Sequence, residues 1–316
     1  MRNALIILLA AGAAGLLYIY SLSIPAALGV PLLAAALVEA ALYLATVTES
    51  ARKRVERYAR PLPLWMAASG VAPYLLCTVP LGRFSWAHFA VVAGLAALVS
   101  FWYVVAPVWR PTDVLFVCVV AAGLLLKPFN GVYPEPRPQL EMSILGRLMW
   151  ARLAMMAVLS VAKMPVKGFG PWPTRNEWIA GARNFALFLP LGVAVGWISG
   201  FASFRPHPAD WRFPLVAVGT FAGMLLVVAL TEEFFVRGLL QEWATRWFRS
   251  ETLALIAVAV IFGLVHLPFR GFPNWTFASL AALAGLFYGR AYIEGRGVRA
   301  AMVTHALVNT VWRVLF

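Results

Sequence analysis

The stretch FPLVAVGTFAGMLLVVALTEEFFVRG, residues 213–238, joins a long apolar run to a cluster of ionisable side chains. Residues 213–230 carry no charge, and a helix of that length nearly crosses the roughly 30 Å of hydrocarbon in a bilayer. Glu232, Glu233 and Arg237 follow directly. Because charge is costly in hydrocarbon, the stretch indicates a membrane helix that carries a polar site.

The composition of the whole chain fits this interpretation. Of the 316 residues, 62% are hydrophobic and 12% are charged, and the mean hydropathy is +0.80. These values exclude an ordinary soluble globular domain. The apolar runs are continuous, whereas barrel strands alternate, so we predict an all-α fold, a polytopic transmembrane bundle of roughly eight to eleven helices.

Apolar runs predict where these helices lie. They cover residues 4–24, 26–47, 64–80, 87–108, 113–127, 142–162, 182–200, 213–240, 252–269, 275–293 and 298–316. The fifth run is short and the sixth carries Arg147 and Arg152, so either one is expected to span or to be re-entrant or interfacial. Pro-rich connections at 127–139 and 163–175 divide the chain. We therefore expect N-terminal transmembrane helices over residues 1–170, of unknown role, and a functional core over 171–316.

The net charge of +13 is interpreted as membrane topology, not as a nucleic-acid surface. Most Lys and Arg residues lie in short loops between apolar runs, as they do in cytoplasmic loops. The loop ESARKRVERYAR, residues 49–60 and ending at Arg60, is the strongest such marker and predicts a cytoplasmic N-terminus.

Three further residues lie inside apolar runs. Cys77 and Cys118 have no metal-type spacing, so we expect core residues and neither a disulfide nor a zinc site. Glu39 is a candidate for a substrate path or proton route, but a protonated carboxyl bonded to a neighbouring helix is the favoured interpretation.

The acidic cluster divides into a paired and a free carboxylate. Glu233 and Arg237 are four residues apart, so on a helix they share a face and form an ion pair. Glu232 points about 100° away and stays free to react. The competing interpretation places all three in the headgroup region at the end of a span.

Two later motifs supply imidazole and carboxamide groups. In FGLVH, Phe262 and His266 share a helix face, and in THALVNT so do His305 and Asn309. Taken singly, each is accounted for by an ordinary hydrogen bond to backbone or to a neighbouring helix.

The depths of these residues coincide. Glu232 lies 18 residues before Ser250, the expected turn, and His266 lies 16 residues after it. At about 1.5 Å per residue, antiparallel helices place the two within about 3 Å of one level. His305 lies about 12 Å beyond Gly297, at a similar depth. A carboxylate shielded from water can act as a base, and donors opposite it can stabilise an oxyanion, so the chemistry indicated is amide hydrolysis.

The three motifs, Glu-Glu-x-x-x-Arg at 232–237, Phe-x-x-x-His at 262–266 and His-x-x-x-Asn at 305–309, resemble those of the CPBP family in order and spacing. This family contains the CAAX proteases and bacteriocin-processing enzymes. The resemblance covers roughly residues 180–316. It implies an intramembrane endopeptidase in a bacterial or archaeal cell membrane. Its substrate would be a membrane-associated protein or peptide, lipidated or not.

The resemblance also implies roles for individual residues. Glu232 and His266 would activate water, and His305 and Asn309 would stabilise the oxyanion. Supporting residues would be Glu233, Arg237 and Phe262. Glu232, His266 and His305 are also an alternative set of zinc ligands. We favour a site without a metal or other cofactor, because HExxH is absent from the sequence and the two histidines lie on separate helices.

Two other function classes fit intramembrane polar residues. A transporter or proton relay uses carboxylates and histidines within the membrane, although two matching halves with interrupted helices are not visible in this sequence. A non-catalytic scaffold or immunity-type protein would keep the same residues for structural reasons alone.

Overall fold

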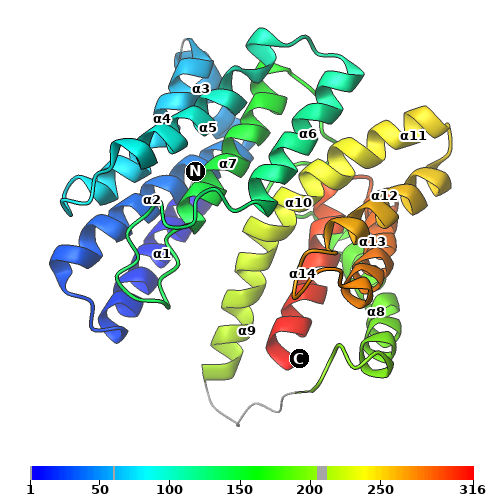
Figure 1. Cartoon of the computed structure of the whole chain (residues 1–316). Helices are drawn as coiled ribbons and strands as arrows, with labels where there is room; N and C mark the ends of the chain where they lie inside the picture. Colours follow the sequence, from blue (N-terminus) through cyan, green and yellow to red (C-terminus); the bar gives the residue numbers. More distant parts are fainter. Residues whose placement is uncertain (1, 60, 205–211) are drawn as a thin grey trace. The chain divides into compact units, whose positions relative to one another are not determined.

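The computed structural model describes residues 2–59, 61–204 and 212–316, and every regular element within these residues is a helix (Figure 1). The all-α prediction is therefore confirmed. The chain forms two compact units, Met1–Pro165 and Val166–Phe316. Their boundary falls inside the Pro-rich connection at 163–175. Each unit is described by itself.

The N-terminal unit is built from helices whose positions follow the apolar runs. They are α1 (Arg2–Ser21), α2 (Ala26–Val47), α3 (Glu49–Tyr58), α4 (Leu62–Thr78), α5 (Trp86–Val105), α6 (Arg110–Leu125) and α7 (Ile144–Met156), which continues as a π-helical turn η1 (Ala157–Val161). Helix α2 packs against α1, α4 and α7, and α5 packs against α4 and α7.

Helix α3 differs from the prediction, because the basic segment at 49–60 was expected to be a loop. Its helix is stabilised by side chains spaced four residues apart. Lys53 lies 2.7 Å from Glu49, and Arg52 lies 3.7 Å from Glu56. The hydrogen bond from Lys53 lowers the pKa of Glu49. The predicted marker residue Arg60 lies outside the described residues.

The C-terminal unit begins with α8 (Arg175–Ile198), whose first turn is closed by a capping box between Thr174 and Glu177. Residues 213–238, the apolar run with its charged end, lie within one continuous helical segment (Figure 1). That segment comprises α9 (Arg212–Gly223), η2 (Met224–Ala229), α10 (Leu230–Phe235), η3 (Val236–Gln241) and α11 (Glu242–Phe248).

The predicted turn at Ser250 is present, because this residue caps the next helix. The remaining helices are α12 (Glu251–Val265), α13 (Trp275–Gly295) and α14 (Val298–Leu315), and α13 packs against α8, α12 and α14.

Five of the described helices are long and apolar enough to cross a membrane. They are Ala26–Val47, Trp86–Val105, Ile144–Val161, Arg175–Ile198 and Phe213–Phe248. Large apolar side chains on such helices, among them Val105 and Ile198, are exposed on the surface of the protein. An apolar surface of that extent is stable when lipid covers it. The chain is an integral, multi-pass membrane protein.

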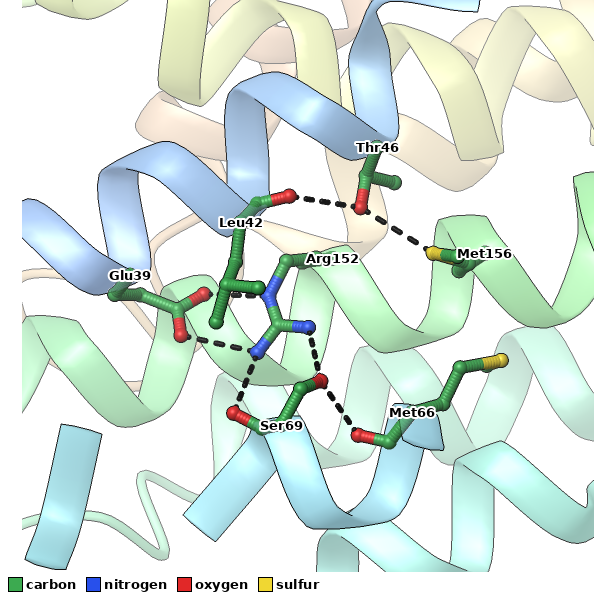
Figure 2. Close-up of polar contacts among 7 residues, drawn as sticks. All are labelled: Glu39, Leu42, Thr46, Met66, Ser69, Arg152 and Met156. Atoms are coloured by element: carbon green, nitrogen blue, oxygen red, sulfur yellow. Dashed lines mark hydrogen bonds and ion pairs between the residues drawn. The ribbon is translucent and has the colours of Figure 1, made fainter. Parts of the chain in front are cut away.

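A buried ion pair ties together three helices of the N-terminal unit (Figure 2). Arg152 of α7 donates from Nε and Nη2 to the two carboxylate oxygens of Glu39 in α2, at 2.8 and 3.0 Å. Its Nη1 donates to the Ser69 hydroxyl of α4 at 2.9 Å. Glu39 is thus bonded to a neighbouring helix, as the favoured interpretation holds. The expected protonated form is not the one seen, because both carboxylate oxygens accept from Arg152. The sixth apolar run tolerates Arg152 because its charge is paired inside the bundle.

The prediction that both cysteines are core residues holds for only one of them. Cys77 is buried, whereas Cys118 on α6 is exposed. In a membrane protein, an apolar residue need not face the protein core, because lipid is an equivalent surrounding. The apolar run around Cys118 therefore did not reveal which face of α6 turns outward.

We predict that breaking the Glu39–Arg152 pair destabilises the fold. Arg152→Met leaves a buried carboxylate without a partner and should cost about 3–5 kcal/mol. The measurement is the midpoint of thermal unfolding in detergent, followed by circular dichroism. The double variant Glu39→Leu/Arg152→Met should recover most of the loss, and Lys53→Gln in the exposed pair of α3 should leave the midpoint unchanged. A single variant as stable as the wild type would contradict this role.

Candidate active site

Among the described acidic residues of the C-terminal unit, Glu233 is the most buried, and its side chain is 0% exposed. Its Oε2 accepts a hydrogen bond from Arg237 Nε at 3.0 Å, so the ion pair that the four-residue spacing predicts is present. Its Oε1 lies 2.6 Å from His305 Nδ1 of α14. Arg237 is equally buried, so neither side chain of this pair reaches the surface of the protein.

Arg237 is also fixed to other helices of the unit. Its Nη2 donates to the Gly285 carbonyl oxygen of α13 at 3.1 Å, and its guanidinium lies 5.5 Å from the centre of the Phe262 ring on α12. His305 stacks on Tyr288 of α13 with ring centres 4.5 Å apart. The buried pair and its partners thus connect the segment that carries them to α12, α13 and α14.

Glu232 differs sharply from its neighbour, because 36% of its side chain is exposed. Its Oε2 lies 3.9 Å from His305 Nε2, too long for a direct hydrogen bond. The α-helical turn that carries both glutamates lies between the π-helical turns η2 and η3. Such turns are rare and occur often at functional sites, where they change the direction of nearby side chains. The apolar pattern along residues 213–240 contained no sign of them.

His266 follows the last residue of α12 and is its C-cap, so it does not lie on the helix itself as predicted. Its Nδ1 lies 2.7 Å from the Phe262 carbonyl oxygen. Since a carbonyl only accepts, Nδ1 carries the proton and Nε2 is left to accept. The rings of Phe262 and Phe277 contact the imidazole, with centres 4.6 and 5.2 Å away. The backbone bond and these rings fix the orientation of the imidazole.

Asn309 lies one helical turn after His305 on α14 and is half-buried. Its Nδ2 is 4.0 Å from Met224 Sδ, a weak contact that leaves the carboxamide able to bind a better acceptor.

The predicted catalytic residues line one cavity of about 410 Å³, although they come from separate segments of the chain. The predicted supporting residue Phe262 lines it too, and Glu233 and Arg237 are not among its lining residues. The cavity is lined by Phe188, Phe201, Met224, Glu232, Phe262, His266, Arg270, Phe277, Leu280, Ala281, Ala284, Tyr288, His305, Val308, Asn309, Trp312 and Arg313. Most of these are apolar, as is usual for a ligand pocket, and the polar groups are few.

Several residues that line the cavity were not predicted from the sequence. Tyr288 lies in an apolar helix, where a tyrosine is typical of an ordinary core residue, so no sequence pattern predicted its stacking on His305. Arg270 and Arg313 lie near helix ends, where basic residues are common.

The three residues of the alternative zinc site, Glu232, His266 and His305, all line the cavity. Within the described residues, no group of three His, Cys, Asp or Glu side chains is placed to hold a metal ion. Nδ1 of His305 faces Glu233, and Nδ1 of His266 faces a backbone carbonyl. Metal-binding histidines commonly bond through one ring nitrogen in this way and bind the metal through the other, so zinc held by Glu232, His266 and His305 stays an alternative prediction.

Part of the C-terminal unit is similar to a known protein family. Residues 214–311 match the Rce1-like type II CAAX prenyl endopeptidase family. The match begins in α9, ends in α14 and contains every predicted site residue. The resemblance to the CAAX proteases drawn from three motifs is confirmed. No curated protein and no solved structure matches the chain significantly. The family match supports a membrane peptidase that acts on membrane-associated proteins, in preference to a transporter or a scaffold.

We predict that Arg237 is needed for the stability of this unit. Arg237→Met leaves the Glu233 carboxylate buried with His305 as its remaining partner, and the expected cost is about 3–5 kcal/mol. Thermal unfolding in detergent measures this as a lower midpoint. Arg246→Gln is the matched control, because Arg246 pairs with Glu242 on the protein surface and such pairs contribute about 1 kcal/mol or less. Equal midpoints for the two variants would show that the buried pair is dispensable.

Proposed function

We propose that this protein is an intramembrane endopeptidase that hydrolyses a peptide bond through a water molecule activated by Glu232 and His266. The observation that supports this most strongly is the shared cavity. Glu232 of α10, His266 at the end of α12, and His305 and Asn309 of α14 all line it. We assign residues 171–316 as the protease core on this basis.

The base in the proposed reaction is Glu232. Its partly exposed carboxylate accepts a proton from water, while His266 Nε2 holds the same water molecule. The water oxygen attacks the carbonyl carbon, and a tetrahedral intermediate with a negatively charged oxygen forms. Glu232 then returns the proton to the amide nitrogen as the C–N bond breaks. The products are a carboxylic acid and an amine.

The developing oxyanion is stabilised by His305 and Asn309. Since Glu233 can only accept at His305 Nδ1, that nitrogen carries a proton. When Nε2 is protonated as well, the ring donates toward the cavity as an imidazolium between two carboxylates. Asn309 Nδ2 supplies a second donor one helical turn away. Preorganised donors of this kind contribute several kcal/mol to acyl transfer, about 2.7–4 kcal/mol for each donor removed.

Glu233 and Arg237 act as positioning residues in this scheme. Glu233 fixes the His305 ring through a 2.6 Å contact, and Arg237 compensates the charge of Glu233. The scheme needs both glutamates. The partly exposed Glu232 reacts with water, and the buried Glu233 holds the His305 ring in place.

The substrate we propose is a membrane-associated protein or peptide. A cavity of about 410 Å³ accommodates a short extended segment and excludes a folded domain. Apolar residues dominate the lining, so the segment beside the scissile bond should be apolar. Lipidation of the substrate is compatible with this lining and is not required by it. For orientation in the membrane we keep the cytoplasmic N-terminus that the basic segment 49–60 indicates.

We predict that Glu232→Gln and His266→Ala abolish peptide cleavage. Each removes one partner of the attacking water, and general acid–base catalysis contributes about 10²–10⁴-fold. The assay is cleavage of a peptide library by purified enzyme in detergent. Glu251→Gln is the control, since Glu251 is an exposed residue in the first turn of α12 and should leave the rate unchanged. Cleavage by both active-site variants at the wild-type rate would overturn the proposal.

A second prediction concerns metal. In the proposed scheme no step uses a metal ion, so incubation with EDTA or 1,10-phenanthroline should leave the cleavage rate unchanged. Loss of activity that added zinc restores would replace this scheme with a metallopeptidase mechanism.

A further inference from the structure

The C-terminal unit begins with an irregular stretch, residues 166–170, that is bonded to the start of α14. The Lys167 carbonyl oxygen accepts a hydrogen bond from the Val298 backbone N–H at 3.0 Å. The Gly168 carbonyl oxygen accepts one from the Arg299 backbone N–H at 3.3 Å. The first N–H groups of a helix have no partner within the helix, so these carbonyls cap α14. We call residues 166–170 the capping segment.

Two glycines let the capping segment approach α14 this closely. A methyl group on Gly168 would lie 2.7 Å from Cα of Gly297, and one on Gly297 would lie 2.6 Å from Cα of Gly168. The optimal separation of two non-bonded carbon atoms is about 3.5–4.0 Å. Gly168 also has φ +61°, a backbone conformation that favours glycine. The two backbones are thus in direct contact, with no flexible side chain between them to absorb a shift.

The capping segment also contacts the helices that carry the buried ion pair of the site. The Phe169 ring lies 4.9 Å from the ring of Phe234 in α10, edge to face. Val166 packs against Gly238 of η3, where an added methyl group would lie 2.6 Å from Val166 Cγ1. Phe234 and Gly238 each directly follow one member of the ion pair in the sequence. The capping segment therefore lies beside both charged residues.

These contacts connect the two helices whose side chains meet behind the cavity. Glu233 lies on α10 and His305 on α14, and their 2.6 Å contact requires that the two helices keep their separation. His305 is seven residues after Val298, so it lies about 10 Å along the helix from the capped end. Over so short a distance a helix is a rigid element, and a shift of its first turn moves the imidazole as well.

We propose that Gly168 and Phe169 are positioning residues, which set the distance between α10 and α14 and so hold His305 against Glu233. This inference rests on the proposed function, in which His305 stabilises the oxyanion. Neither residue is among the described residues that line the cavity, so both act from outside it. A misplacement of about 1 Å can lower the rate of an enzyme about a hundredfold.

The first test is the steady-state cleavage rate of Gly168→Ala. The added methyl group must displace the backbone of Gly297, so we expect kcat to fall about 10–100-fold. KM should stay unchanged, because the cavity lining is the same. Gly82→Ala is the matched control and should keep the wild-type kcat. Gly82 also has φ +61°, and beyond its neighbours in the chain no atom of the described residues lies within 4 Å of an added methyl group.

Phe169→Leu is a second, milder change that keeps both backbone hydrogen bonds, and it carries the test if Gly168→Ala does not fold. It removes the aromatic contact with Phe234 and should lower kcat about two- to tenfold. Lys167→Gln is its control within the capping segment. The Lys167 side chain is exposed and pairs with Glu242, and the substitution keeps the backbone carbonyl, so kcat should be unchanged.

Combination with His305→Ala separates positioning from stability. If Gly168 and Phe169 act through His305, substituting either one should cost nothing further in kcat once His305 is alanine. The midpoint of thermal unfolding should fall by the same amount in both backgrounds. An equal loss of kcat with and without His305 would mean that the capping segment only stabilises the unit, and that result overturns the proposal.

A spectroscopic readout tests the proposal without peptide cleavage. The chain has four histidines, so nitrogen-15 labelling of histidine gives few ring signals, and His305→Ala identifies the signal of His305. A proton on Nδ1 in a short hydrogen bond to a carboxylate resonates far downfield. We expect this signal to shift or disappear in Gly168→Ala and Phe169→Leu, and to keep its position in Gly82→Ala and Lys167→Gln.

The two outcomes of this measurement are distinct from failure of the proposed function. A signal that moves in the two capping-segment variants and not in the controls supports the positioning role, even if the proposed water activation is wrong. A signal that stays at the wild-type position in both variants overturns the positioning role and leaves the peptidase proposal intact.

Discussion

The structure depends on one constraint, that a charge placed among apolar helices must have a partner. Each unit of the chain meets it with an acid and an arginine. In the N-terminal unit the pair is Glu39 and Arg152, and in the C-terminal unit it is Glu233 and Arg237. Removing water from both partners is costly, and additional hydrogen bonds offset part of this cost, because Arg152 also donates to Ser69 and Arg237 also donates to the Gly285 carbonyl oxygen. Each pair therefore also fixes how its helices pack.

The same constraint gives adjacent glutamates different chemistry. Consecutive residues on a helix point about 100° apart, so Arg237, which shares a helix face with Glu233, does not pair with Glu232. Glu233 is fully buried and holds the ring of His305, while Glu232 stays partly exposed in the cavity. A paired acid next to a free one is thus a direct consequence of the motif Glu-Glu-x-x-x-Arg. We consider this arrangement the physical basis of the proposed hydrolysis.

Most of the helices could be predicted from the sequence, because continuous apolar runs of membrane length strongly favour membrane helices over any other structure. That Glu232, His266, His305 and Asn309 lie close together could be predicted as well, since four-residue spacing and equal depth constrain them strongly. The polar helix α3 was missed because the helices were predicted from apolar runs, and α3 is instead stabilised by ion pairs between its side chains. The π-helical turns beside α10 and the position of His266 beyond α12 were missed because they depend on packing. Arg270 was missed because only folding brings it to Phe201 and Phe277.

The most direct test of the central claim is a double-mutant cycle on Glu232 and His266, with kcat/KM measured for both single variants and the double variant. If the two side chains act on one water molecule, removing the second after the first costs little more. The account therefore predicts a double variant about as slow as the slower single variant. Losses that multiply would show that the two residues act independently, and that result would contradict a shared water.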